Sequence, residues 1–255
     1  MTNIDVARRA AREAGKRIRS IRPEDAEVTT KADDSPVTKA DREASDIIHD
    51  ILLSETPHGV IDEERGVTRP DQETVWIVDP LDGTKEFIRG TQEYTVNIAL
   101  VTNGSPVGGA VYVPATDIMY HANEDEAWCD DQRLAPSDAE LEDATVAVST
   151  SHPDEALNDF LSHAGIGALR GVGSSLKGCR VAAGELNAYP RFQELYSWDV
   201  AAMHAVLEGA GCRMTTWEDE RILHGDGRIP GFIAAPPELH QAFLDAREAW
   251  AAKHS

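Results

Sequence analysis

The stretch Trp76-Ile77-Val78-Asp79-Pro80-Leu81-Asp82-Gly83-Thr84-Lys85-Glu86-Phe87 decides the fold of this chain. An apolar run typical of a β-strand ends at Asp79, the fixed φ of Pro80 predicts a turn, and a second acid, Asp82, follows. Two carboxylates held this close repel each other unless a cation lies between them. Carboxylate oxygens together with the Leu81 carbonyl oxygen suit Mg²⁺ or Mn²⁺ better than zinc. The turn therefore predicts a metal site.

The residues after the second acid predict an anion site beside the metal. Gly83-Thr84 stands where a short helix could begin. Backbone N–H groups at a helix start are oriented to meet a phosphate. One short segment thus offers both metal and phosphate ligands.

The composition excludes several classes of protein. The chain has 255 residues, of which 41% are hydrophobic, enough for a substantial core. It carries 45 acidic and 24 basic residues, a net charge of −21, so we expect no nucleic-acid binding through a basic surface. The widely spaced cysteines Cys129, Cys179 and Cys212 do not fit a disulfide framework or a zinc site.

The sequence also suggests where the protein works. It has no apolar run of the roughly 18 residues that span a membrane and no apparent signal peptide, so we expect a cytoplasmic protein without membrane insertion. Lysine is scarce beside arginine, and the acidic surface would repel itself in dilute buffer. We hypothesise a halophilic enzyme, because concentrated salt screens such charges. The alternative is an ordinary acidic protein.

The hydrophobic pattern predicts a mixed α and β organisation. Helices are expected at 3–22, from Thr38 to about 52, at 153–164, 175–183 and 198–210, and after Pro236-Pro237. Strands are expected at 59–62, 75–78, 95–101, 107–113, 118–122, 127–129, 146–149 and 232–235. Asn103-Gly104 predicts a hairpin turn, and 28–36 is expected to be a loop.

This order predicts a single domain over residues 1–255 with two lobes. The first lobe, about 1–143, has the α+β pattern, and the second, about 144–255, has the alternating α/β pattern. No repeat or flexible linker separates them. We therefore expect the α/β class and one compact unit.

Other acids at element ends are candidates for completing the metal site. Glu63-Glu64 follows a strand, as Asp79 does, so the two strand ends could bring these acids together. Asp199 opens a predicted helix, where its charge would also suit the helix dipole. Asp41, in the first turn of another helix, is by itself interpreted as a solvated helix acid.

These motifs together resemble a known family. Asp79-Pro80-Leu81-Asp82-Gly83-Thr84, with Glu63-Glu64 before it and Trp198-Asp199-Val200-Ala201-Ala202 far downstream, is similar to the signature of the inositol monophosphatase superfamily of Mg²⁺-dependent, lithium-sensitive phosphatases. Four further segments resemble its 3′(2′),5′-bisphosphate nucleotidases: 31–41, Lys85-Glu86-Phe87, Ser174-Ser175-Leu176-Lys177 and Tyr189-Pro190-Arg191-Phe192.

The resemblance implies a layered αβαβα sandwich with two or three Mg²⁺ ions, for which Mn²⁺ could substitute. It implies that Glu64, Asp79 and the Leu81 carbonyl hold the first ion, that Asp79, Asp82 and Asp199 hold the second, and that a looser third lies near Glu64. Asp41 and Thr84 would position or deprotonate the attacking water, with Asp33 nearby, and Gly83 and Thr84 would bind phosphate. Ser174, Lys177, Arg191 and His152 would contact the nucleotide. One departure is Asp62, where relatives commonly carry a small residue; it would add negative charge near the metals or belong to the acidic surface.

The implied reaction is hydrolysis of the 3′-phosphate of adenosine 3′,5′-bisphosphate by metal-activated water, giving AMP and phosphate. Its partner is a small phosphorylated molecule, and the chain would be a monomer or a weak homodimer. Inositol-1-phosphatase and fructose-1,6-bisphosphatase activity on the same scaffold remain alternatives. A non-catalytic metal-binding or ligand-binding protein is the alternative from another class.

Overall fold

A large mixed sheet forms the centre of the computed structural model, which describes residues 2–30, 36–70, 72–151 and 153–254. Its strand order is β10-β9-β8-β7-β6-β5-β3-β4, and only the β3 and β5 neighbours run parallel. The strands are β3 (Gly59–Asp62), β4 (Gly66–Thr68), β5 (Thr74–Asp82), β6 (Thr95–Thr102), β7 (Ser105–Val113), β8 (Ile118–Asn123), β9 (Ala127–Cys129) and β10 (Gln132–Arg133).

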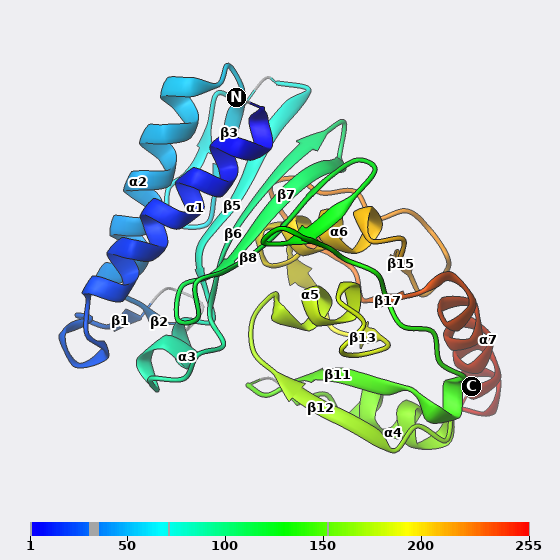
Figure 1. The fold of residues 1–255 in the computed structure, drawn as a ribbon. Coiled ribbons are helices and arrows are strands. Elements are labelled where there is room, and N and C mark those ends of the chain that lie inside the picture. The colour runs from blue at the N-terminus through cyan, green and yellow to red at the C-terminus, as the bar shows by residue number, and fades with distance from the viewer. Residues whose placement is uncertain (1, 31–35, 71, 152, 255) are drawn as a thin grey trace.

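Helices cover both faces of this sheet (Figure 1). Helices α1 (Asn3–Ser20) and α2 (Lys39–Glu55) pack on one face, and α5 (Leu176–Ala182) and α6 (Ala201–Gly209) lie on the other. Beyond α5 and α6 come the sheets β11 (Thr145–Ser149) with β12 (Ala168–Val172), and β13 (Tyr189–Arg191) with β17 (Phe232–Ala235) and β15 (Arg213–Thr216). Helices α4 (Glu155–His163) and α7 (Pro237–His254) form the outer layer. The αβαβα layering and the α/β class are confirmed.

Short elements connect these layers. They are the 3₁₀ turns η1 (Pro23–Asp25), η2 (Leu141–Asp143) and η3 (Ser197–Asp199), the helix α3 (Thr84–Ile88), and the strands β1 (Thr29–Thr30), β2 (Pro36–Val37), β14 (Leu195–Tyr196) and β16 (Arg228–Ile229). Within the described ranges, no helix is both long enough and apolar enough to cross a membrane.

The alternation of side chains along β6 explains how the sheet holds two cores. Val96, Ile98 and Leu100 are buried against α1 and α2, whereas Ala99 and Val101 are buried on the opposite side with α5 and α6. A strand with both faces covered is apolar at every position, which explains why 95–101 reads as a continuous apolar run. Thr95 and Asn97 are the polar residues in that run, and Asn97 lies on the α5 side, where it bonds Ser175.

Most local expectations are confirmed by the structure. Thr38 caps α2 with a reciprocal capping box, and the turn between β6 and β7 has Asn103 and Gly104 at positive φ, as a tight hairpin requires. The expected loop 28–36 contains the short β1–β2 pair, with 31–35 outside the described residues. The expected helix 198–210 begins instead at Ala201, because 197–199 forms the η3 turn.

The sequence pattern missed the short strands β4, β10 and β12 to β16. Each has five residues or fewer, too short for a periodic signal. The lobe boundary at 143/144 stays a prediction, because the buried residues between the large sheet and α5 and α6 come from both ranges.

Candidate active site

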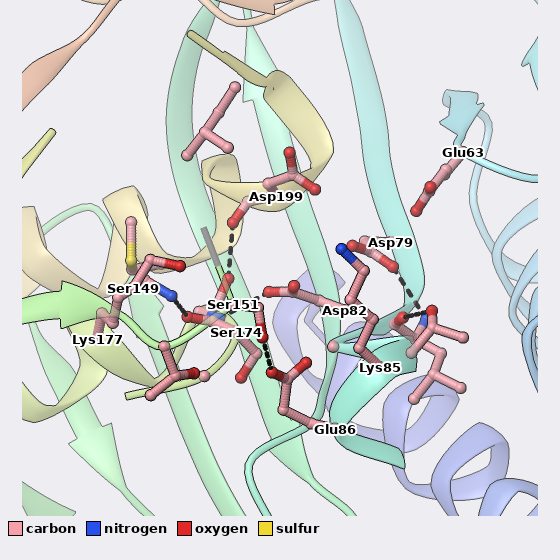
Figure 2. Close-up of a pocket in the computed structure, with 18 of the residues that line it drawn as sticks. Glu63, Asp79, Asp82, Lys85, Glu86, Ser149, Ser151, Ser174, Lys177 and Asp199 are labelled. Atoms are coloured by element: carbon pink, nitrogen blue, oxygen red, sulfur yellow. Dashed lines mark hydrogen bonds between the residues drawn. The ribbon is translucent and has the colours of Figure 1, made fainter. Parts of the chain in front are cut away.

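A pocket of about 210 Å³ opens where the end of β5 meets the start of α5 (Figure 2). Segments from both halves of the sequence form its wall. The lining residues are Pro36, Glu63, Asp79, Leu81, Asp82, Gly83, Thr84, Lys85, Glu86, Ser149, Thr150, Ser151, Gly173, Ser174, Ser175, Lys177, Tyr189, Arg191, Leu195, Asp199 and Met203. The predicted turn 79–84 therefore lies at the pocket, although 79–82 continues strand β5 with a bulge and the chain turns only at Gly83 before α3.

Three carboxylates gather on one side of the pocket. One oxygen from each of Asp79, Asp82 and Asp199 lies within 4.8 Å of the other two. Asp79 is 2% exposed. Oxygen ligands sharing a hard cation such as Mg²⁺, at about 2.1 Å from it, are separated by roughly 3 to 4 Å. The donor set and its spacing therefore fit one or two divalent cations.

A bulge in β5 places the first two acids on the same side of the sheet. Val78 and Leu81 are both buried in the core under α1 and α2, and the register with β6 shifts between Asp79 and Asp82. In an unbroken strand, residues three apart would point to opposite faces. Because the bulge changes the alternation, Asp79 and Asp82 both reach the pocket.

The protein environment disfavours charge on all three acids. Burial, and then the negative charges of Glu63 and Asp82, raise the pKa of Asp79 well above its ordinary value. Burial, followed by Asp82 and Glu63, does the same to the pKa of Asp199. Burial raises the pKa of Asp82 as well, although the Lys177 ammonium opposes it. A bound divalent cation would remove this repulsion, which is the chemistry expected of a metal site.

The acid that reaches the pocket from the end of β3 differs from the one expected. Glu63, and not Glu64, lines the pocket, and its carboxylate points towards Asp79 in Figure 2. Asp62 fixes this choice: its Oδ1 accepts the backbone N–H groups of Glu64 and Arg65, at 2.8 and 3.1 Å. The turn closed by these bonds directs the first of the two glutamates into the pocket.

Asp62 itself is a structural residue. It is 1% exposed, so it does not belong to the acidic surface, and its Oδ2 accepts a hydrogen bond from Ser45 at 2.9 Å. It is not among the described residues that line the pocket. The expectation that Asp62 adds charge to the metal site or the surface is therefore replaced by a role in shaping the turn.

Asp41 and Thr84 meet beside the acids, as expected. Thr84 Oγ1 lies 3.0 Å from Asp41 Oδ1 and 3.2 Å from the Leu81 carbonyl oxygen. Burial is the largest influence on Asp41 and raises its pKa, against the lowering effect of its hydrogen bonds to Thr38 and Thr84. The Leu81 carbonyl oxygen thus lies beside the threonine hydroxyl. Gly83, with φ at 91°, turns the chain between β5 and α3.

The expected substrate residues Ser174, Lys177 and Arg191 also line the pocket. The Lys177 ammonium donates to the Ser174 carbonyl at 2.6 Å and lies 5.4 Å from the centre of the Tyr189 ring. Arg191 is 9% exposed, and its buried Nε has no hydrogen-bond partner among the described residues. Two fixed cations therefore face the acid cluster. The expected contacts His152 and Asp33 lie outside the described residues.

Several pocket residues were not predicted as site residues. Ser149 ends β11, Ser151 lies two residues after it, and Ser175 follows β12, so all three stand at the carboxyl ends of two parallel strands. Glu86 accepts a short hydrogen bond from Ser151 across the pocket (Figure 2). For Ser149 and Ser151, the signal is their place at the end of predicted strand 146–149 and before a predicted helix; for Ser175, it is its place at the start of predicted helix 175–183. Asn97 is not among the lining residues, but it donates hydrogen bonds to Asp82 and Ser175 behind the pocket wall. The sequence feature that could have identified it is an amide side chain within an otherwise apolar strand.

Comparisons with known proteins agree with this geometry. A sequence model of the inositol monophosphatase family matches residues 2–251. The chain is 41% identical over 230 residues to the 3′(2′),5′-bisphosphate nucleotidase CysQ of Escherichia coli K12, covering 86% of this chain and 92% of the relative. It is 29% identical over 257 residues to the inositol-1-monophosphatase of Bacillus subtilis, covering 96% of each.

Solved structures show the same fold. The suhB protein of Bartonella henselae superposes with a TM-score of 0.85 at 28% identity, covering 95% of this chain and 96% of that one. CysQ of Bacteroides thetaiotaomicron superposes with a TM-score of 0.76 at 35% identity, covering 92% and 97%. The sequence match, the fold and the acid-lined pocket together show that this chain belongs to the inositol monophosphatase family.

Proposed function

We propose that this phosphatase is a Mg²⁺-dependent 3′(2′),5′-bisphosphate nucleotidase that converts adenosine 3′,5′-bisphosphate to AMP and phosphate. One observation carries the proposal: a buried acid cluster and two fixed cations, Lys177 and Arg191, face each other across one pocket. The first group suits metal ions, and the second suits an additional phosphate. The similarity to CysQ nucleotidases supports the same substrate.

We assign the metal ligands with one change from the sequence expectation. Glu63, Asp79 and the Leu81 carbonyl would hold one Mg²⁺, and Asp79, Asp82 and Asp199 a second, with a looser third ion near Glu63. Mn²⁺ could replace Mg²⁺, since both prefer oxygen ligands. When bound, such ions activate water and neutralise charge on the entering and leaving oxygens of a phosphoryl group.

The protein's own groups orient the water and the phosphate in this proposal. Thr84 donates its hydroxyl proton to Asp41, which leaves the threonine oxygen free to accept a hydrogen bond from the attacking water. Asp41 in its carboxylate form then receives the proton through Thr84. The Gly83 and Thr84 amides would hold equatorial phosphate oxygens, because both residues line the pocket at the start of α3.

Lys177 and Arg191 would select a substrate with two phosphates. The buried Nε of the Arg191 guanidinium has no hydrogen-bond partner among the described residues. The guanidinium can therefore bind a second phosphate, which a sugar monophosphate lacks. Ser174, with φ at 46°, is held in a conformation that non-glycine residues rarely adopt. That strain turns the chain at the pocket wall and leads into the helix that carries Lys177.

Parallel assays of phosphate release with Mg²⁺ test the proposal. Adenosine 3′,5′-bisphosphate should be hydrolysed with a higher kcat/KM than inositol 1-phosphate or fructose 1,6-bisphosphate. Adding Li⁺ to the same reactions tests the expected lithium sensitivity. A clear preference for either sugar phosphate would contradict the nucleotidase assignment and support the activity named for the Bacillus relative or the fructose alternative.

The same assay separates an enzyme from a non-catalytic binding protein. The pairing of Thr84 with Asp41 beside the acids Asp79, Asp82 and Asp199 favours catalysis, because a protein that only binds metal has no need of a hydroxyl and carboxylate placed to orient water. Asp82→Asn should abolish Mg²⁺-dependent turnover while the far-ultraviolet circular dichroism stays unchanged. An unaltered rate would reject the role assigned to Asp82.

A further inference from the structure

Asn97 of β6 is buried directly beside the metal-site acids. It is 0% exposed and pairs with Asp79 in the β5–β6 register. Its Nδ2 group lies 3.1 Å from Asp82 Oδ2 and 2.8 Å from Ser175 Oγ. A carboxylate can only accept hydrogen bonds, so the amide nitrogen must be the atom that faces Asp82. Each of its two hydrogens therefore has its own acceptor.

Ser175 continues this chain of hydrogen bonds to the third acid. Its backbone N–H donates to Asp82 Oδ2 at 2.6 Å, and its Oγ donates to the Asp199 carbonyl oxygen at 2.7 Å. The same Oγ accepts from Asn97, so the serine hydroxyl both donates and accepts within the network. Both of these donors to Asp82, from Asn97 and from Ser175, bind the same oxygen, Oδ2. One oxygen is held in place, and Oδ1 remains for a cation.

The network joins segments that are distant in sequence. Asp82 and Asn97 belong to the large sheet, Ser175 precedes α5, and Asp199 lies in η3. One oxygen of Asp82 lies within 4.8 Å of one oxygen of Asp199, so the two negative charges repel each other when no cation lies between them. Neutral donors that fix Asp82 and the Asp199 backbone prevent the two acids from moving apart when no cation lies between them.

We propose that Asn97 and Ser175 are positioning residues that fix the separation of Asp82 and Asp199 and thereby set the divalent-metal affinity of the site. The inference rests on the proposed metal site and deepens it, because neither residue is assigned as a ligand. A preorganised site spends less binding energy on bringing like charges together. Outer hydrogen-bond partners of metal ligands typically account for about 10- to 100-fold in metal affinity.

Mn²⁺ titration of the metal-free full-length protein, followed by electron paramagnetic resonance, measures this affinity without turnover. Asn97→Leu and Ser175→Ala should each raise the Mn²⁺ dissociation constant by about 10- to 100-fold. Ser175→Thr keeps the hydroxyl and should restore most of the affinity. At saturating metal, the kcat of both loss variants should return towards the wild-type value, because no catalytic group is removed.

Thr95→Val is the matched control. Thr95 lies two residues from Asn97 on the same side of β6, is 0% exposed, and its hydroxyl has no hydrogen-bond partner among the described residues. Removing this buried hydroxyl should leave the Mn²⁺ dissociation constant within about twofold of the wild type, as expected for a group with no bond to a metal-site acid. Thermal unfolding in EDTA, measured for every variant, separates a loss of affinity from a loss of fold.

The possible outcomes separate the two proposals. Wild-type Mn²⁺ affinity in folded Asn97→Leu and Ser175→Ala variants would overturn the positioning role and leave the metal site standing. An equal loss in Thr95→Val would also overturn it, because the effect would then be general to β6. If the wild-type protein itself bound no Mn²⁺, the proposed metal site would be wrong and the inference would fall with it.

Discussion

Thr84 Oγ1 lies 3.0 Å from Asp41 Oδ1, while Asp41 Oδ2 accepts the Thr38 backbone N–H at 2.8 Å and the Thr38 hydroxyl at 2.5 Å. The two oxygens of this carboxylate therefore have separate tasks. Oδ2 caps α2, and Oδ1 faces the pocket through Thr84. One residue belongs to both the fold and the proposed chemistry.

Asp41→Asn should separate these two tasks. Asparagine can keep its one oxygen towards the Thr38 backbone N–H and hydroxyl and turn its amide nitrogen towards Thr84, so the melting temperature should change little. The amide cannot take the proton from Thr84, and kcat should fall by about 10²- to 10⁴-fold. Steady-state kinetics and thermal unfolding measure both quantities. Thr84→Ser should retain far more activity than Thr84→Val, and equal rates for these two variants would contradict the proposed role of the hydroxyl.

Glu63 and Glu64 form a natural matched pair. Glu63→Gln should raise the Mg²⁺ concentration needed for half-maximal activity by about tenfold or more, because a lost charged contact costs about 1.5 to 3 kcal/mol. Glu64→Gln makes the same chemical change one residue away and should shift that concentration by less than about twofold. Mg²⁺ titrations of activity measure both. The opposite ranking would restore Glu64 as the ligand.

The stabilising effect of Mg²⁺ should increase with pH. Burial and mutual repulsion raise the folded-state pKa of Asp79 and Asp199, so the metal-free fold binds their protons more tightly than the unfolded chain does. Their favourable contribution is present below the ordinary carboxyl pKa and is lost as the pH rises through the raised values. A bound cation removes this penalty where the acids are charged.

Thermal unfolding with Mg²⁺ and with EDTA, between about pH 5 and pH 8, tests this linkage. The quantity to compare is the difference between the melting temperatures in Mg²⁺ and in EDTA at each pH, because two buried histidines also make the stability depend on pH. Burial lowers the pKa of His240 to about 4 and that of His224 well below its usual value, so the fold is destabilised as the pH falls with or without metal. At a metal concentration 100 times the dissociation constant, the gain is about 2.7 kcal/mol, or several degrees. A Mg²⁺ effect that is equal at all pH values would contradict the proposed linkage.

Salt should stabilise this protein. The chain has 45 acidic and 24 basic residues, and its net charge of −21 favours expansion through self-repulsion. Raising NaCl from about 0.1 M to about 2 M reduces the Debye length to a few ångströms, so the melting temperature and activity should rise. Na₂SO₄ at matched ionic strength helps to separate screening from ion-specific effects. Full stability and activity in dilute buffer would reject the halophile hypothesis.

Local chemistry accounts for what could be predicted from the sequence. Asp79-Pro80-Leu81-Asp82 identifies an acid-rich break at the end of a strand, because the fixed φ of the proline and the spacing of the two carboxylates are local, whereas the bulge against β6 brings both acids to the same side. The capping box at Thr38 and the Asn103-Gly104 turn are equally clear, since each depends on residues within a few positions of one another. Trp198-Asp199 is more ambiguous: a helix-start acid and a metal ligand look alike in sequence, and η3 decides the geometry.

The remaining site residues depend on contacts that local sequence does not encode. Adjacent side chains at the end of a strand point to different sides, so a shift of one residue decides whether Glu63 or Glu64 faces the pocket. Asp62, buried against Ser45, determines the outcome. Asn97 gains its role only because β6 lies beside β5 and Ser175 approaches from the other half of the chain.

The sequence by itself determined the family, the acid-lined turn, and most helices and longer strands, because these follow from periodicity and from residues close together in the chain. The tertiary structure decided which glutamate enters the pocket and which neutral side chains hold the acids. The physical reason is that two parallel strand pairs, β3 with β5 and β11 with β12, deliver their carboxyl ends to one place. Only that packing brings Asp82, Ser175 and Asp199 within hydrogen-bonding distance of one network.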